Sequence, residues 1–239
     1  MPSLFADLKA YYSEEGKRAA VEAVVEELKS TLESTGTLDG STGAYPSRVA
    51  QVVAPTSMTG RRLTRHWPLP DYTQPPTTLL WTYYFLSLHY SHPSPANPTP
   101  DPARALGYLE AALAHTPTLP ELYTARARVL KHSGDALGAA RAMDDARALD
   151  GQDRFLNSKS GKYWLRAGEP ERAQAILGLF TKKDAPSPAA DLVDMQCFWF
   201  VTEDAACWEQ KGRLGMALKR YTQLFKVRHS RRLSRAFAC

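Results

Sequence analysis

Apolar positions recur along this chain mainly at helical spacing. In the first 36 residues, two apolar faces repeat every three to four positions, which predicts two helices. From residue 79 to residue 225 the same spacing returns, and no alternating apolar run is long enough for a strand. The pattern therefore predicts an all-α protein. The two N-terminal faces consist of Leu4, Phe5, Leu8 and Tyr12, and of Ala20, Val21, Val24, Val25 and Leu28.

Residues 37–78 interrupt this pattern. The stretch contains Gly, Ser, Thr and Pro throughout, which is typical of a flexible linker or an insertion. A small basic cluster within it (Arg61, Arg62, Arg65 and His66) is interpreted as part of a solvated linker, with a docking motif as the alternative. The predicted organisation is an N-terminal helical hairpin over 1–36, a disordered linker over 37–78, helical hairpins over 79–225 and a basic, disordered tail over 226–239.

An internal repeat organises the helical part. Gly134 and Gly168 lie 34 residues apart, as do Ala139 and Ala173. This is the period of the tetratricopeptide repeat (TPR), in which small residues let paired helices approach and a glycine turns the chain between them. The other aligned positions are Tyr123, Ala127, Leu130, Met143 and Ala146 in one copy, and Asn157, Gly161, Trp164, Leu177 and Phe180 in the next.

Two looser copies flank this pair, so the sequence predicts four TPR-like hairpins in a solenoid. The first copy has a Pro-rich segment between its helices, and the last follows the insertion TKKDAPSPAADL. TPR arrays hold other protein chains, so the pattern favours a binding function over catalysis. The copies contain Trp81, Tyr84, Leu88, Ala105, Leu109, Ala112 and Pro117, and Val201, Ala205, Trp208, Gly212, Ala217, Tyr221 and Leu224.

The charge of the chain is concentrated at one end. Of 239 residues, 30 are Lys or Arg and 25 are Asp or Glu, a formal net charge of +5. The range 226–239 holds five of these bases and no acid, so the rest of the chain is balanced. There is no signal-peptide pattern and no apolar run of the ~18 residues that a membrane span needs. Three cysteines without CxxC spacing indicate a reducing, cytoplasmic compartment.

One constellation points to ligand binding. Lys159, Lys162, Tyr163 and Arg166 share one face of a predicted helix, and the nearest acid in sequence, Asp153, precedes that helix. This pattern fits a pocket for a polyphosphate, and a solvated basic ridge is the alternative. The complete set of candidate anion-binding residues is Lys131, His132, Arg141, Lys159, Lys162, Tyr163 and Arg166.

The sequence offers no catalytic or metal-binding motif. The six histidines form neither an HExxH motif nor a Cys/His cluster, so no metal site is predicted. His89 and His92 lie three residues apart, but His92 falls in a Pro-rich turn. Cys197 and Cys207 lie in apolar helical patterns and are interpreted as core thiols.

Several segments together resemble a known family. They are PSLFADLKAYY, PPTTLLWTYYFLSLHY, TPTLPELYTARARVLKHSGDALGAARAMDDARALD, ALDGQDRFLNSKSGKYWLRAGEPERAQAIL and MQCFWFVTEDAACWEQKGRLGMALKRY. In this order they resemble an internal part of the auxiliary TPR subunit of the N-terminal acetyltransferase A (NatA) complex. The ranges 43–70 and 226–239 depart from the family pattern.

The resemblance implies a non-catalytic scaffold. Such a subunit holds the catalytic acetyltransferase subunit and assists association with the ribosome. The acetyl-CoA turn R/Q-x-x-G-x-G/A of the catalytic partner does not occur here, so no acetylation is expected of this chain alone. The family also binds inositol hexakisphosphate, and the matching positions are Lys131, Arg141, Lys162 and Tyr163.

Two other functions stay open at this point. The chain could be a general TPR adaptor that binds peptide segments of partner proteins. It could also bind ribosomes or nucleic acid through the basic tail, in which case binding would fall steeply with salt. No membrane contact and no specific nucleic-acid partner are expected of the preferred scaffold.

Overall fold

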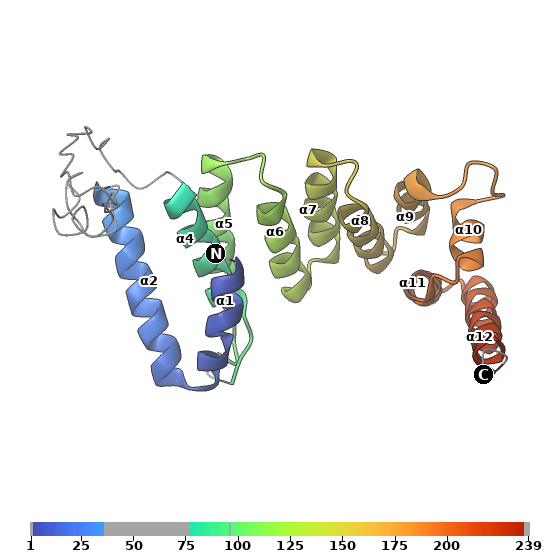
Figure 1. Ribbon diagram of the computed structural model, residues 1–239, viewed down its shortest axis with the longest axis horizontal. Helices are drawn as coiled ribbons and strands as arrows, with labels where there is room; N and C mark the ends of the chain where they lie inside the picture. The colour runs from blue at the N-terminus through green and yellow to red at the C-terminus, as the bar shows by residue number, and fades with distance from the viewer. Residues whose placement is uncertain (1, 36–76, 96, 237–239) are drawn as a thin grey trace, which may run out of the picture. The chain divides into compact units, whose positions relative to one another are not determined.

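The structure is helical in every part that it describes. This computed structural model describes the backbone of residues 2–35, 77–95 and 97–236, and the side chains of 4–34, 77–95 and 97–225. Within these ranges the elements are helices, besides one isolated bridge between Ser94 and Asn97. The prediction of an all-α protein is therefore confirmed. The chain forms two compact units, Met1–Pro117 and Thr118–Cys239, and successive helices lie side by side within each (Figure 1).

The first unit contains the N-terminal helices and one hairpin. Its elements are α1 (Pro2–Leu8), the 3-10 helix η1 (Lys9–Ser13), α2 (Glu15–Thr35), α4 (Thr77–Ser91) and α5 (Pro102–His115). Helices α4 and α5 pack against each other through the residues that the first TPR-like copy predicted, which include the fully buried Ala105, Leu109 and Ala112. Asp101 caps α5 by accepting a hydrogen bond from the backbone N–H of Arg104 (2.9 Å).

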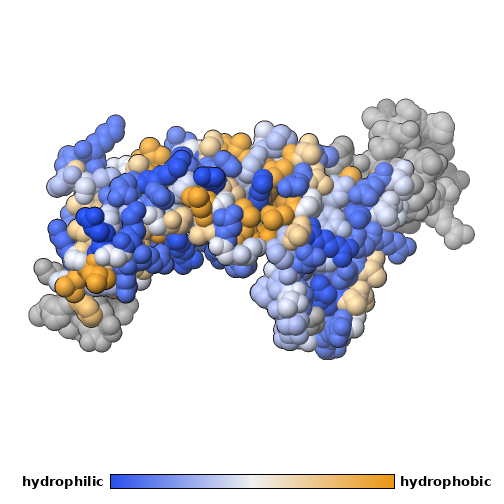
Figure 2. Space-filling view, turned by 180° about the vertical axis from the view of Figure 1, so that it is seen from behind, coloured by the Kyte–Doolittle hydropathy of each residue, from blue (hydrophilic) through white to orange (hydrophobic). Residues whose placement is uncertain are grey.

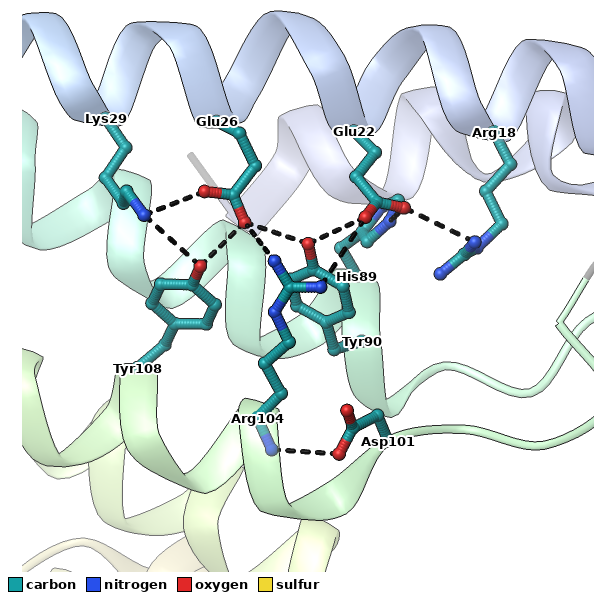
Figure 3. Close-up of polar contacts among 9 residues, drawn as sticks. All are labelled: Arg18, Glu22, Glu26, Lys29, His89, Tyr90, Asp101, Arg104 and Tyr108. Carbon is teal, nitrogen blue, oxygen red and sulfur yellow. Dashed lines mark hydrogen bonds and ion pairs between the residues drawn. The ribbon is translucent and has the colours of Figure 1, made fainter.

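A polar network attaches α2 to this hairpin (Figure 3). The carboxylate of Glu26 lies 2.8 Å from the Tyr90 hydroxyl and 2.6 Å from the Tyr108 hydroxyl. Glu22 lies 2.8 Å from the same Tyr90 hydroxyl, and Arg104 approaches both acids, at 3.8 Å from Glu22 and 3.2 Å from Glu26. The two acids of α2 therefore contact side chains from both α4 and α5.

This network changes the predicted face of α2. Val24, which the sequence pattern placed on an apolar face, is 64% exposed. The side of α2 that meets α4 and α5 carries Glu22, Glu26 and Lys29 beside the partly buried Val21, Val25 and Leu28. Their partners are tyrosines and an arginine that are distant in sequence, so a periodicity of apolar residues could not reveal the contact.

The second unit contains the regular repeats. Its elements are α6 (Pro120–His132), α7 (Ala136–Leu149), α8 (Arg154–Arg166), α9 (Pro170–Leu177), η2 (Gly178–Phe180), α10 (Pro188–Asp194), α11 (Phe198–Gln210) and α12 (Leu214–Ala236). The helices form the hairpins α6–α7, α8–α9 and α11–α12. Asp135 and Asp153 cap α7 and α8 with their carboxylates.

The predicted turn glycines have the conformation that a TPR hairpin requires. Gly134, Gly168 and Gly212 have φ angles of +89°, +82° and +68°, in the left-handed region that glycine adopts without a steric penalty. In each turn the next residue donates a backbone hydrogen bond five residues back, as from Asp135 N to Leu130 O (3.0 Å). The 34-residue spacing therefore corresponds to a repeated helix ending.

Two regions differ from the predicted organisation. The insertion TKKDAPSPAADL contains the start of α10, because Ser187 caps its first turn and Pro188 occupies its first position. Helix α12 continues to Ala236, so the backbone of residues 226–236 is helical, and the prediction of a disordered tail is wrong for this stretch. Of the predicted linker, only residues 77 and 78 are described, and they begin α4. The basic cluster Arg61, Arg62, Arg65 and His66 lies outside the described residues.

Candidate functional site

The predicted basic face forms on α8. Asp153 fixes the start of this helix by accepting hydrogen bonds from the backbone of Phe155 (2.6 Å) and Leu156 (3.4 Å). This start sets the helical register, so that Trp164 and Leu165 are buried while the cations reach the surface. Lys159 and Arg166 are exposed and Lys162 is half-buried.

Helix α6 brings further cations to the same place. Lys131, in the last turn of α6, is half-buried, and its pKa lies below its ordinary value. Burial is the largest cause, and the positive charges of Arg166, Arg128, Lys159 and Lys162 add to it. The charges of these four residues thus reach Lys131, and we call the five residues together the basic cluster.

Arg128 is the member of this cluster that the sequence analysis missed. It is exposed on α6, one helical turn before Lys131. The spacing of three residues was a usable signal, since it places both side chains on one face of the helix.

Glu203 corrects the expectation that this face has no acid. Its carboxylate comes from α11 and lies 3.0 Å from Lys162 Nζ. It also accepts two hydrogen bonds from Arg166, from Nη2 at 2.6 Å and from Nε at 2.9 Å. Burial alone would raise the pKa of Glu203, but the hydrogen bonds from Arg166 and Lys162 outweigh it and hold this pKa below its ordinary value. Two of the predicted cations are therefore ion-paired.

The other predicted residues occupy different places. Tyr163 is buried, and its pKa is raised by burial although Arg128 and Arg166 lie near enough to oppose the rise. His132 ends α6, and its pKa is lowered by partial loss of contact with water and by the positive charges of Lys131 and Arg128. Arg141 is exposed on α7, and no interaction among the described side chains connects it to the basic cluster.

Aromatic rings line the basic cluster. The ammonium of Lys159 lies 5.3 Å from the ring centroid of Phe155, which is 61% exposed. The ammonium of Lys162 lies 5.8 Å from the ring centroid of Trp199. Both distances are within the range of cation–π attraction, which orients the lysines without neutralising their charge.

The titratable side chains that the structure describes in the two units suit binding more than catalysis. Burial raises the pKa of Cys197, and it raises that of Cys207 to about 11, so neither thiol is a ready nucleophile. His89, in the first unit, contacts Tyr12 (2.6 Å) and Glu22 (3.2 Å). In the part of the chain that the structure describes, no group of His, Cys, Asp and Glu could hold a metal ion. None of the described helices has the length and hydropathy to cross a membrane.

Comparison with known proteins agrees with this picture of a binding surface. A family model described as "N-terminal acetyltransferase A, auxiliary subunit" matches residues 69–230, more than half of the chain. The chain belongs to this family. The suspected NatA resemblance is thus confirmed, and the family consists of auxiliary subunits.

Individual relatives in the NatA auxiliary family extend the match. The chain is 33% identical over 226 residues to the "N-terminal acetyltransferase A complex auxiliary subunit NAA15" of Arabidopsis thaliana. This match covers 95% of this chain and 21% of that protein. It is 43% identical over 147 residues to the human "N-alpha-acetyltransferase 16, NatA auxiliary subunit". This match covers 62% of this chain and 16% of the human protein. The chain thus spans about a fifth of the length of these curated relatives.

A solved structure of this family supports the fold. The structure of Naa15/Naa10 bound to HypK-THB matches 95% of this chain and 28% of the compared chain, with a TM-score of 0.71 and 34% sequence identity. At this similarity the fold is shared, so the chain has the TPR-like helical architecture that its repeat predicted.

Proposed function

We propose that this chain is a non-catalytic scaffold of a cytoplasmic N-terminal acetyltransferase A complex, in which it holds the catalytic subunit. The observation that carries this proposal is the structural match over 95% of the chain to a protein that was solved as Naa15/Naa10. Helical hairpins that expose side chains along successive helices suit this role, since they offer an extended surface to a second protein.

Co-expression tests the scaffold function directly. The 239-residue chain should co-purify with a NatA catalytic subunit, and the pair should acetylate peptides that begin with Ser or Ala. The catalytic subunit alone and the chain alone are the controls, and the chain alone should be inactive. Absence of association at micromolar concentrations of both proteins would contradict the proposal.

We also propose that the basic cluster binds a polyphosphate of the inositol hexakisphosphate type. The charges of four cations from α6 and α8 act on Lys131, and one carboxylate, Glu203, is ion-paired with two of them. Phosphate oxygens are strong acceptors for Lys and Arg, and several phosphates on one ring can contact cations from both helices. A ligand there would connect α6 to α8 within the second unit.

Calorimetry with inositol hexakisphosphate tests this site. Lys131→Glu should weaken binding by about tenfold or more, because it reverses a charge at the centre of the cluster. Lys219→Glu is the matched control, since Lys219 is exposed on α12 and changes the net charge equally. Equal losses in the two variants would indicate nonspecific attraction and contradict a defined site.

Association with the ribosome is the last part of the proposal. The five bases of residues 226–239, without any acid, support attraction to ribosomal RNA through phosphate contacts. The complex should therefore co-sediment with ribosomes at low salt and dissociate as salt rises. Replacing the five bases by Gln should abolish this co-sedimentation, whereas unchanged co-sedimentation would assign it to another surface.

A further inference from the structure

Glu203 lies in the basic cluster as a fixed negative charge. It projects from α11, and its side chain is only 17% exposed. Its two oxygens bind Arg166 through parallel hydrogen bonds of 2.6 Å and 2.9 Å, and one of them also contacts Lys162 at 3.0 Å. Paired charge-assisted hydrogen bonds of this kind are how a guanidinium binds a carboxylate or a phosphate. Glu203 thus occupies the groups that a phosphate would use.

This contact divides the basic cluster into two halves. Lys162 and Arg166 are paired with Glu203. For Arg128, Lys131 and Lys159, the described residues supply no acidic partner. The unpaired half can accept an anion directly. The paired half can do so only when Glu203 moves away from Lys162 and Arg166, or when the anion binds them beside Glu203.

We infer that Glu203 is an internal counter-anion that competes with the ligand and restricts the cluster to ligands carrying several phosphate groups. The inference rests on the anion site proposed above and concerns how that site is regulated. A single phosphate gains contacts only with the unpaired half. A ligand with several phosphates gains enough contacts across both halves to replace Glu203 at Lys162 and Arg166.

Glu203 could also have the opposite effect and assist ligand binding. Its hydrogen bonds could hold Lys162 and Arg166 in place so that they bind the ligand better. Removing the carboxylate would then weaken binding, whereas removing a competitor strengthens it. The sign of the change in affinity therefore separates the two roles.

Titration calorimetry on the 239-residue chain, at one salt concentration, measures this sign. Inositol hexakisphosphate and inorganic phosphate are the two probes. Glu203→Gln should bind inositol hexakisphosphate about tenfold more tightly, because a unit negative charge a few ångströms from the ligand is lost. The same variant should also bind inorganic phosphate more tightly than the parent chain does. Glu14→Gln is the matched control, since it removes another ion-paired carboxylate (2.7 Å from Lys17) and should leave both affinities unchanged.

Each outcome decides between the hypotheses. Unchanged or weaker binding by Glu203→Gln overturns the counter-anion and leaves the anion site standing. Binding by the variant but not by the parent supports the counter-anion and overturns the site in the natural chain. Absence of binding by both overturns both. If Glu203→Gln does not fold alone, inositol hexakisphosphate should restore its helical circular dichroism by replacing the lost negative charge, and failure to do so overturns the inference.

Discussion

Gly161 allows a close approach between the two helices of one repeat. A Cβ atom at this position would lie 2.7 Å from both Cγ and Cδ2 of Leu177, which is closer than packed side chains approach. Leu177 is itself buried in the core of the second unit, so it has little room to move. The glycine is thus required by the packing of α8 against α9, in keeping with the small residue that the repeat pattern placed there.

Gly161→Ala should therefore destabilise the protein by about 1–3 kcal/mol through overpacking. Denaturant unfolding followed by circular dichroism measures the change. Gly215→Ala is the matched control, because an added Cβ in α12 would meet nothing within 4 Å. This control should be neutral or stabilise by up to about 1 kcal/mol, since alanine favours a helix. Similar losses in both variants would contradict the packing argument.

At the scale of elements, polar contacts hold α2 to the α4–α5 hairpin. Tyr90 is the central residue, since its hydroxyl lies 2.8 Å from both Glu22 and Glu26 (Figure 3). Its ring is buried and stacks on Tyr108, with centroids 5.8 Å apart. Two carboxylates thus share one buried hydroxyl donor.

Tyr90→Phe should loosen α2 without unfolding the hairpin. The loss of the hydroxyl leaves two half-buried carboxylates with fewer donors, which costs about 1–3 kcal/mol. Amide hydrogen exchange should accelerate in α2 more than in α5. Tyr11→Phe is the control, because Tyr11 is 47% exposed and donates no hydrogen bond to the described residues. Unchanged exchange in α2 would show that the network does not hold this helix.

The same network makes the first unit sensitive to acid. His89 Nε2 faces Glu22 and carries the proton, so Nδ1 accepts the hydrogen bond from Tyr12. Burial lowers the pKa of His89 below its ordinary value of 6.5 despite the nearby carboxylate. For Glu26, burial opposes ionisation, but hydrogen bonds from Lys29, Tyr108 and Tyr90 lower its pKa to about 2.

Both shifts predict that the free energy of unfolding decreases as the pH is lowered. The unfolded chain protonates His89 below about 6.5 and Glu26 below about 4.5, whereas the folded chain resists both steps. Thermal unfolding midpoints should therefore be constant above pH 7, fall as the pH drops below 6.5 and fall again below 4.5. His89→Gln should reduce the first decrease to the part that His132 contributes, while His115→Gln, at an exposed position, should leave it unchanged. An undiminished first decrease in His89→Gln would assign it to other groups.

At the scale of the molecule, α12 presents an apolar stripe to solvent. Leu214, Leu218 and Phe225 are 67%, 68% and 69% exposed and lie on one side of the helix. Hydrophobic residues are visible at the surface beside the C-terminal end in Figure 2. A neighbouring side of α12 packs on α11, where Ala217 is buried. An exposed apolar stripe of this kind favours association with other molecules.

Through this stripe the chain should self-associate as its concentration rises, and Leu218→Gln should reduce that self-association while leaving stability nearly unchanged. Sedimentation velocity over a range of concentrations measures the first effect, and thermal unfolding measures the second. Ala217→Gln is the neighbouring comparison, because Ala217 is only 3% exposed and a larger polar side chain there should destabilise the fold. Self-association that is unaffected by Leu218→Gln would exclude the stripe as its cause.

The sequence by itself determined the repeat architecture. Gly134 and Gly168 end helices with positive φ angles, and Asp135 and Asp153 cap the helices that follow. Such features depend on neighbours within a few residues, so their spacing is visible in the sequence. The basic residues of α8 were predictable for the same reason, because helical periodicity alone places them on one face.

Only the tertiary structure decided how these charges are balanced. Arg166 and Glu203 are 37 residues apart, and Tyr12 and His89 are 77 apart, yet each pair is in hydrogen-bond contact. Neither contact follows a period, because each depends on which helix faces lie against each other after folding. Electrostatic energy depends on distance in space, and a sequence orders charges only along the chain. The sequence therefore predicted a basic face, and the fold supplied Glu203 as its counter-charge.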